Sequence, residues 1–152
     1  MTQFYRKAAC NIVKQAHPSF DRQAESDQAA AGGFRPEPFA GQLRYGEPEL
    51  IALDHQQSLK AEGYSVRLAG DRATRLHRGI IANPEAERLA LVTLDNGNRL
   101  AANFDEFDLT TGYSSGSMIR EAIIIDVRNL RSRIARMIEN AAAIVGEPDD
   151  GE

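Results

Sequence analysis

Tryptophan is absent from this sequence, cysteine occurs once, at Cys10, and the unbroken apolar runs are only a few residues long. A single cysteine excludes an intramolecular disulfide and is typical of a reducing compartment. The short apolar runs exclude a membrane-spanning helix, and the N-terminal region lacks the apolar core of a signal peptide. We therefore expect a cytoplasmic protein without a membrane segment.

The chain is also short. Its 152 residues are 42% hydrophobic and 26% charged, which is typical of a globular domain. A (β/α)₈ barrel needs about 250 residues, and a two-domain dehydrogenase needs more. We therefore expect one domain, with or without helical attachments.

Positive charge is scarce and unevenly placed. The net charge is −4, from 18 basic and 22 acidic residues. Residues 1–63 hold 7 basic and 8 acidic residues, 64–104 hold 6 and 4, and 105–152 hold 5 and 10. The overall balance argues mildly against a dedicated duplex-DNA protein, since phosphate binding requires basic surface. All basic residues of the middle stretch are arginines, which suit planar recognition of phosphate or carboxylate.

The N-terminal third indicates helices. Apolar residues at a spacing of about 3.6 predict an amphipathic helix over residues 2–16, which His17-Pro18 should end. Ser19 is a suitable cap for a second, weaker helix through Ala31. Residues 32–48 are rich in glycine and proline and predict a connector. A third helix should then run from Pro48 to Gly63.

From Tyr64 the apolar spacing changes to about two, which favours strands. We predict one strand over residues 65–69, one bent strand or two over 72–82, and a strand or turn over 105–109. Asn96-Gly97 indicates a two-residue hairpin loop between residues 89–94 and 98–104, so that position 94 faces 99. This register predicts that five apolar residues share one face of the hairpin, which should belong to the core. They are Leu89, Leu91, Leu100, Ala102 and Phe104.

A third pattern occupies the C-terminal part. Residues 110–117 predict a loop, and Ser117 is a suitable cap for a long helix from about Met118 to Val145. Its heptad spacing favours self-association as a homodimer or higher oligomer, although the same face could instead pack on the chain's own N-terminal helices and barrel. The acidic residues 147–152 should form a tail. The heptad residues are Ile123, Val127, Leu130, Ile134, Met137, Ala141 and Ile144.

The β region resembles a small SH3-like barrel of the KOW/Tudor kind. The residues that carry the resemblance are Gly70-Asp71-Arg72, Gly79-Ile80-Ile81, residues 91–97 and residues 104–109. The layout is similar to the barrel inserted in relaxase-type superfamily-one helicases of conjugative elements. In those helicases an ATPase motif follows the barrel. Here Gly112-Tyr113 are present, but residues 114–118 replace the reactive part and the chain has no P-loop. The resemblance implies a barrel, not an ATPase, and suggests an accessory protein of a phage or plasmid.

Together these patterns predict an α+β protein with N-terminal helices, a small antiparallel SH3-like β-barrel and a long amphipathic C-terminal helix. The expected segments are 1–31 (helical), 32–48 (connector), 49–109 (helix plus barrel), 110–146 (loop and oligomerisation helix) and 147–152 (acidic tail).

Catalytic patterns are weak. Residues 112–116 match the G-x-S-x-G pattern of a nucleophile elbow, but no histidine follows His77 to complete a triad. A flexible capping loop is the simpler interpretation, and an anion site at the start of the following helix is an alternative. His17, His55 and His77 are scattered without a metal-ligand spacing, so no metal site and no cofactor is expected.

The arginines of the β region suggest an anion-binding surface for a partner protein or a nucleic acid, although they could equally form a solvated outer face. We therefore predict a non-enzymatic binding, adaptor or inhibitor protein. An oligomeric binder of a nucleotide or other small anion is the alternative, and a small enzyme is the third possibility. The candidate binding residues are Arg67, Arg72, Arg75, His77, Arg78, Arg99, Ser114, Ser115 and Ser117.

Overall fold

A computed structural model describes residues 2–141. The described chain is mixed α+β, as predicted, with five α-helices, a three-stranded sheet and a four-stranded sheet. It divides into two compact units. The first takes in the chain up to Thr74 together with the C-terminal part from Arg131, and the second runs from Arg75 to Leu130. Each unit is described by itself below.

Three helices of the first unit lie where the sequence predicts helices. They are α1 (Arg6–Lys14), α2 (Arg22–Ala30) and α3 (Glu47–Ala61). Helix α1 ends ahead of His17-Pro18, because the residue before proline avoids the helical region. The cap of α2 is Asp21, whose Oδ1 accepts a hydrogen bond from Ala24 N at 2.8 Å. Ser19 was expected to be that cap, so α2 begins later than predicted.

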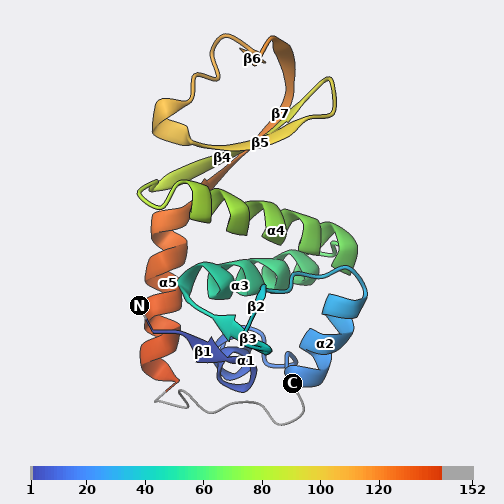
Figure 1. Ribbon diagram of the computed structural model, residues 1–152, viewed down its shortest axis with the longest axis vertical. Helices are drawn as coiled ribbons and strands as arrows, with labels where there is room; N and C mark the ends of the chain where they lie inside the picture. Colours follow the sequence, from blue (N-terminus) through green and yellow to red (C-terminus); the bar gives the residue numbers. More distant parts are fainter. Residues whose placement is uncertain (1, 142–152) are drawn as a thin grey trace. The chain divides into compact units, whose positions relative to one another are not determined.

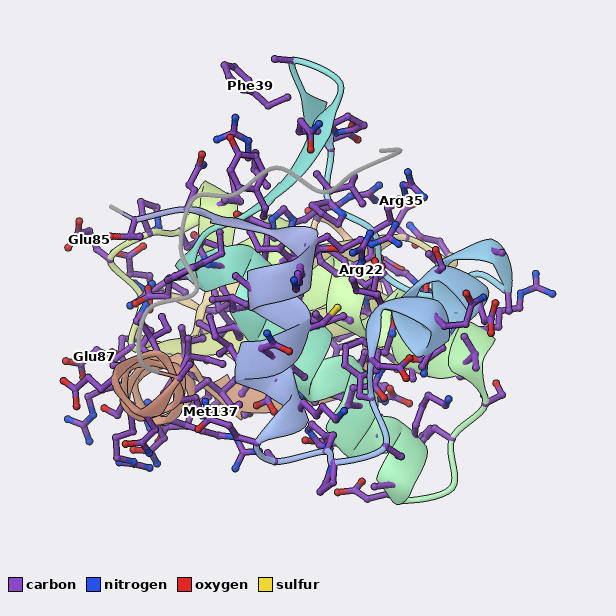
Figure 2. All side chains as sticks on the ribbon, turned by 90° about the horizontal axis from the view of Figure 1, so that it is seen from below. Arg22, Arg35, Phe39, Glu85, Glu87 and Met137 are labelled. Atoms are coloured by element: carbon purple, nitrogen blue, oxygen red, sulfur yellow. The ribbon has the colours of Figure 1, made fainter. Side chains whose placement is uncertain are left out.

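The stretch 32–48, expected to be a connector, also contains strands. Strands β2 (Pro38–Phe39) and β3 (Gln42–Tyr45) form a hairpin, and β3 also pairs with β1 (Phe4–Tyr5), in the order β1-β3-β2. Leu43 and Tyr45 of β3 are buried. Figure 2 shows Phe39 at the outer tip of this hairpin, where 68% of the residue is exposed.

Helix α4 (Val66–Ala82) replaces the strands predicted for residues 65–69 and 72–82, so those predictions are wrong. Its buried residues Ala69, Ala73, Leu76 and Ile80 are spaced by four, three and four, which is a helical period. Local alternation in Ser65–Ala69 concealed this longer period. A barrel built from residues 69–109 is therefore not formed, since residues 69–82 supply no strand.

The second unit contains a curled antiparallel sheet in the order β5-β4-β7-β6 (Figure 1). Its strands are β4 (Arg88–Leu94), β5 (Arg99–Asn103), β6 (Tyr113–Ser114) and β7 (Ser117–Asp126). A short 3₁₀ turn (Phe104–Glu106) follows β5, at the place where a strand or turn was predicted. Buried residues on both faces of β4 show that this strand is the centre of the unit's core.

The β4–β5 hairpin is confirmed, but its register differs from the prediction by one residue. Leu91 faces Ala101, and Leu94 N donates to Asn98 O at 2.8 Å. The loop therefore has three residues, ending at Gly97 with φ +87°. Because side chains alternate along a strand, a shift of one residue moves them to the other face. Leu100 and Phe104 consequently pack with Ala90, Val92 and Leu94, not with Leu89 and Leu91.

Strand β7 and helix α5 (Val127–Asn140) occupy the region predicted to be one long helix from Met118. The helical prediction is wrong for residues 118–126 and holds for 127–140. Three consecutive β-branched residues, Ile123 to Ile125, favour the strand. The N-terminal cap is Asp126, whose Oδ1 accepts from Asn129 N at 2.9 Å, and not Ser117.

Candidate functional site

Five of the predicted binding residues lie on helix α4 and not on strands. Arg67 and Arg72 belong to the first unit, and Arg75, His77 and Arg78 to the second. The predicted arginine-bearing β surface is therefore wrong in its composition. Of the remaining four, Arg99 lies in β5, Ser114 in β6 and Ser117 in β7, with Ser115 in the turn between the last two.

Two of the α4 arginines contact neighbouring groups of their own unit. The Arg72 guanidinium lies 5.9 Å from the centre of the Tyr64 ring, a distance typical of a cation–π contact. Arg75 Nη2 donates to Val92 O at 3.4 Å. The second unit holds 6 arginines and 8 acidic residues between positions 75 and 130, a net charge of −2. That unit is therefore not a basic domain.

The G-x-S-x-G segment forms a tight hairpin. Ser114 faces Ser117 across β6 and β7, and Ser115 and Gly116 of the turn have φ values of +50° and +77°. Strand β7 follows, so the helix N-terminus on which the predicted anion site depended is not there. This geometry also differs from a nucleophile elbow, which joins a strand to a helix.

The same hairpin presents a pair of large apolar side chains. Tyr113 faces Met118 across β6 and β7, and the two residues are 56% and 49% exposed. Further along β7, Ile124 is 43% exposed and faces buried Ala90. Tyrosine and methionine are enriched at protein interfaces. Exposed Met118 and Ile124 on β7, with Tyr113 of β6 opposite Met118, therefore mark β7 as a candidate contact surface.

Strand β7 also has a largely unpaired edge. It has ten residues and pairs with β4 from Ile119 to Asp126, whereas two-residue β6 covers only Ser117 and Met118 on the other side. Ile119 N donates to Gly112 O at 2.7 Å. Beyond it, no strand among residues 2–141 pairs with this edge. Its free backbone groups are a template for another strand.

The heptad residues are mainly covered by their own chain. Val127, Ile134 and Met137 are buried, whereas Ile123, Leu130 and Ala141 are half-buried. Figure 2 shows Met137 on the side of α5 that faces α1, and Gln15 Nε2 donates to Met137 O at 2.6 Å. Ile123 lies in β7 and not in the helix. Ile144 falls outside the described residues.

A polar cluster that the sequence did not reveal lies in the first unit. Asp54 of α3 is 2% exposed, and its Oδ1 lies 2.9 Å from His17 Nε2. Arg133 of α5 donates to Oδ2 through Nε at 2.8 Å and to Oδ1 through Nη2 at 3.1 Å. Burial alone would raise the pKa of Asp54, but the hydrogen bonds from His17 and Arg133 hold it below its ordinary value. Asp54 is therefore an ionised acceptor.

His17 also lines a pocket of about 560 Å³, called here the His17 pocket. Volumes of this size are typical of small-molecule sites. Its apolar lining residues are Ala16, Pro18, Phe20, Ala24 and Ala61. Its polar lining residues are His17, Ser19, Gln28, Gln57 and Lys60. The only sequence signal at this site was the helix-ending His17-Pro18 pair.

A buried amide network forms one wall of the His17 pocket. Gln28 Oε1 accepts hydrogen bonds from Gln56 Nε2, at 3.0 Å, and from Gln57 Nε2. Gln56 Oε1 in turn accepts from Phe34 N. Because two donors occupy its oxygen, the amide of Gln28 is held in one orientation, which makes the wall of the pocket rigid.

Comparison with known proteins gives no relative: no protein-family model matches the chain, and no curated protein matches it significantly. Within residues 2–141, no group of three or more His, Cys, Asp or Glu side chains is placed to hold a metal ion. No helix of that described part is both long and apolar enough to cross a bilayer.

Proposed function

We propose that the protein is a non-enzymatic binding or adaptor protein that takes an extended segment of a partner protein along the open edge of β7. One observation carries this proposal: β6 covers two residues of a ten-residue strand. Strand addition gives affinity through backbone hydrogen bonds and specificity through alternate side chains. The curled sheet here takes the place of the predicted SH3-like barrel.

The side chains around the open edge support a protein partner. Ile124 offers an apolar contact beside the edge, and Tyr113 and Met118 extend it at the β6 end. Arg120 and Glu121, both exposed, precede the apolar part, and Asp126 follows it, which leaves Ala122 to Ile125 as its uncharged section. Charged residues limit unspecific strand pairing, whereas an uncharged section permits it.

Charge favours a protein over a nucleic acid as the partner. The net charge of −2 of the second unit opposes phosphate binding. Four of the arginines that suggested a phosphate surface, Arg67, Arg72, Arg75 and Arg78, belong to helix α4 and not to a strand, whereas Arg99 lies in β5. A protein segment needs no positive field, because backbone pairing and apolar contacts supply its affinity.

A selection from a random peptide library on the immobilised full chain tests this proposal. We expect selected peptides to be extended and apolar at alternate positions. On ¹⁵N-labelled protein, they should shift the amides of residues 120–124 and protect from exchange those amides, alternating along the strand, that point to the open edge. Ile124→Lys should weaken binding by about tenfold or more, since a charged edge residue disfavours strand addition.

Ile81→Lys is the matched control. Ile81 is 58% exposed and lies on α4 in the same unit, so this variant introduces the same charge away from the edge. It should leave peptide binding unchanged. The proposal fails if no peptide is selected, if the protected amides lie elsewhere, or if both variants lose binding equally.

A further inference from the structure

We propose that the His17 pocket binds a small organic anion, namely a carboxylate or phosphate group on an apolar body. This site is independent of the β7 edge, because all its lining residues belong to the first unit.

The ionisable side chains that line the pocket favour negative charge. Lys60 supplies an ammonium group and His17 an imidazole, and no aspartate or glutamate is among the lining residues. The carboxylate of Asp54, which His17 contacts, is also paired with Arg133 of α5. Asp54 therefore adds no uncompensated negative charge to the pocket.

Hydrogen-bonding atoms at the pocket are free to reach a ligand. Since Asp54 is an ionised acceptor, His17 uses Nε2 as a donor to it, and Nδ1 has no partner among residues 2–141. Gln28 is 8% exposed, and its Nε2 likewise has no partner in the described chain, because both bonds to its amide end on Oε1. The free amide N–H₂ group of Gln28 can donate to an anion.

Helix ends near the pocket do not cancel this preference. Helices α1 and α3 both end there, and the carbonyl groups at a helix C-terminus attract positive charge. Backbone donors already bind those carbonyls, however. His17 N donates to Val13 O at 3.2 Å, and Gly63 N donates to Lys60 O at 3.0 Å. The ammonium group of Lys60 therefore decides the sign of the ligand.

The apolar lining specifies the rest of the ligand. Phe20 is 1% exposed and forms the pocket together with Ala24 and Ala61, which have small side chains. Removing apolar ligand surface from water is favourable here. An anion with an aromatic or branched aliphatic body therefore fits better than a bare inorganic ion.

Benzoate and phenyl phosphate are suitable probes, titrated into the ¹⁵N-labelled full chain. At least one should shift the amides of residues 16–20, 24 and 57–61, and the pair distinguishes a carboxylate site from a phosphate site. Benzyl alcohol and benzylammonium, which share the ring but lack negative charge, should bind at least about tenfold more weakly.

Lys60→Met should weaken anion binding by about tenfold, whereas Lys14→Met should leave it unchanged. Lys14 is exposed at the end of α1 and does not line the pocket. The proposal is overturned if the neutral and anionic probes bind equally, if Lys60→Met has no effect, or if the shifts map elsewhere. If Lys60→Met fails to fold, the comparison of probes on the unaltered chain decides.

Discussion

Neighbouring residues Asp54 and His55 show how burial sets protonation at the scale of single side chains. Both pKa values are lowered, with different consequences. Asp54 remains charged because His17 and Arg133 bind it. Burial, and then the nearby charge of Arg72, lowers the pKa of His55 from 6.5 to about 4, so that His55 is neutral near pH 7. Its Nε2 is buried and has no hydrogen-bond partner within residues 2–141.

His55 should make the protein sensitive to mild acid. Below pH 6.5 the unfolded chain binds a proton at His55, while the folded chain does not until about pH 4. The free energy of unfolding should therefore be highest above pH 6.5 and fall by about 3 kcal/mol on the way to pH 4. Urea unfolding at a series of pH values measures this loss.

His55→Gln is the control for this pH dependence, because the chain contains two other histidines, His17 and His77. The variant should flatten the profile between pH 6.5 and 4. Asp54 does not interfere, since its stabilisation is complete above its ordinary pKa of 3.8 and is lost only as the pH falls through its lower folded value. An equally steep profile in His55→Gln would contradict this assignment.

At the scale of elements, the sequence predicts those structures whose signals are local. The His17-Pro18 pair and Pro48 mark helix ends close to the observed bounds of α1 and α3, and Asn96-Gly97 identifies the hairpin, whereas the cap of α2 is Asp21 and not the predicted Ser19. Helix α4 and strand β7 depend instead on packing. Gly70 lies between the two predicted strand segments, although it is a contact residue within α4. The candidate sites are less predictable still, since His17, Asp54 and Arg133 are brought together from positions 37 and 79 residues apart.

Gly70→Ala tests the packing of α4. Alanine is the better helix former by about 1 kcal/mol, so an exposed helical position would gain stability. A Cβ at position 70 would lie 2.3 Å from Gly32 O and 2.6 Å from Gly33 Cα, and backbone atoms cannot move aside cheaply. We expect a loss of about 2–3 kcal/mol in the free energy of unfolding.

Gly79→Ala is the comparison for Gly70→Ala, as both glycines lie within α4. Its Cβ would meet side chains, Ala101 Cβ at 3.0 Å and Leu89 Cδ1 at 3.1 Å, which have more freedom to adjust. Its loss in a urea melt should be smaller than that of Gly70→Ala. A stabilised Gly70→Ala would show that α4 does not approach the Gly32-Gly33 backbone.

At the scale of the whole molecule, the heptad spacing suits either packing against a second copy or packing within the chain. The structure shows α5 packed within a single chain. Ile134 is 1% exposed and Met137 is 7% exposed, and α5 is also joined to the first unit by Arg131–Glu47, at 3.2 Å, and by Arg133–Asp54. An apolar face that is already buried cannot also form an interface between chains without opening the fold. The heptad pattern is therefore explained without a partner helix.

Native mass spectrometry should accordingly give the mass of one chain, 16.7 kDa. Ile134→Ala should lower the free energy of unfolding by about 2–4 kcal/mol and leave the mass unchanged. Ser132→Ala, on an exposed position of the same helix, should change stability by less than about 0.5 kcal/mol. An interface between subunits requires the opposite result, an integer multiple of the chain mass that Ile134→Ala converts to single chains. The comparison separates a helix that completes its own fold from one that joins two copies.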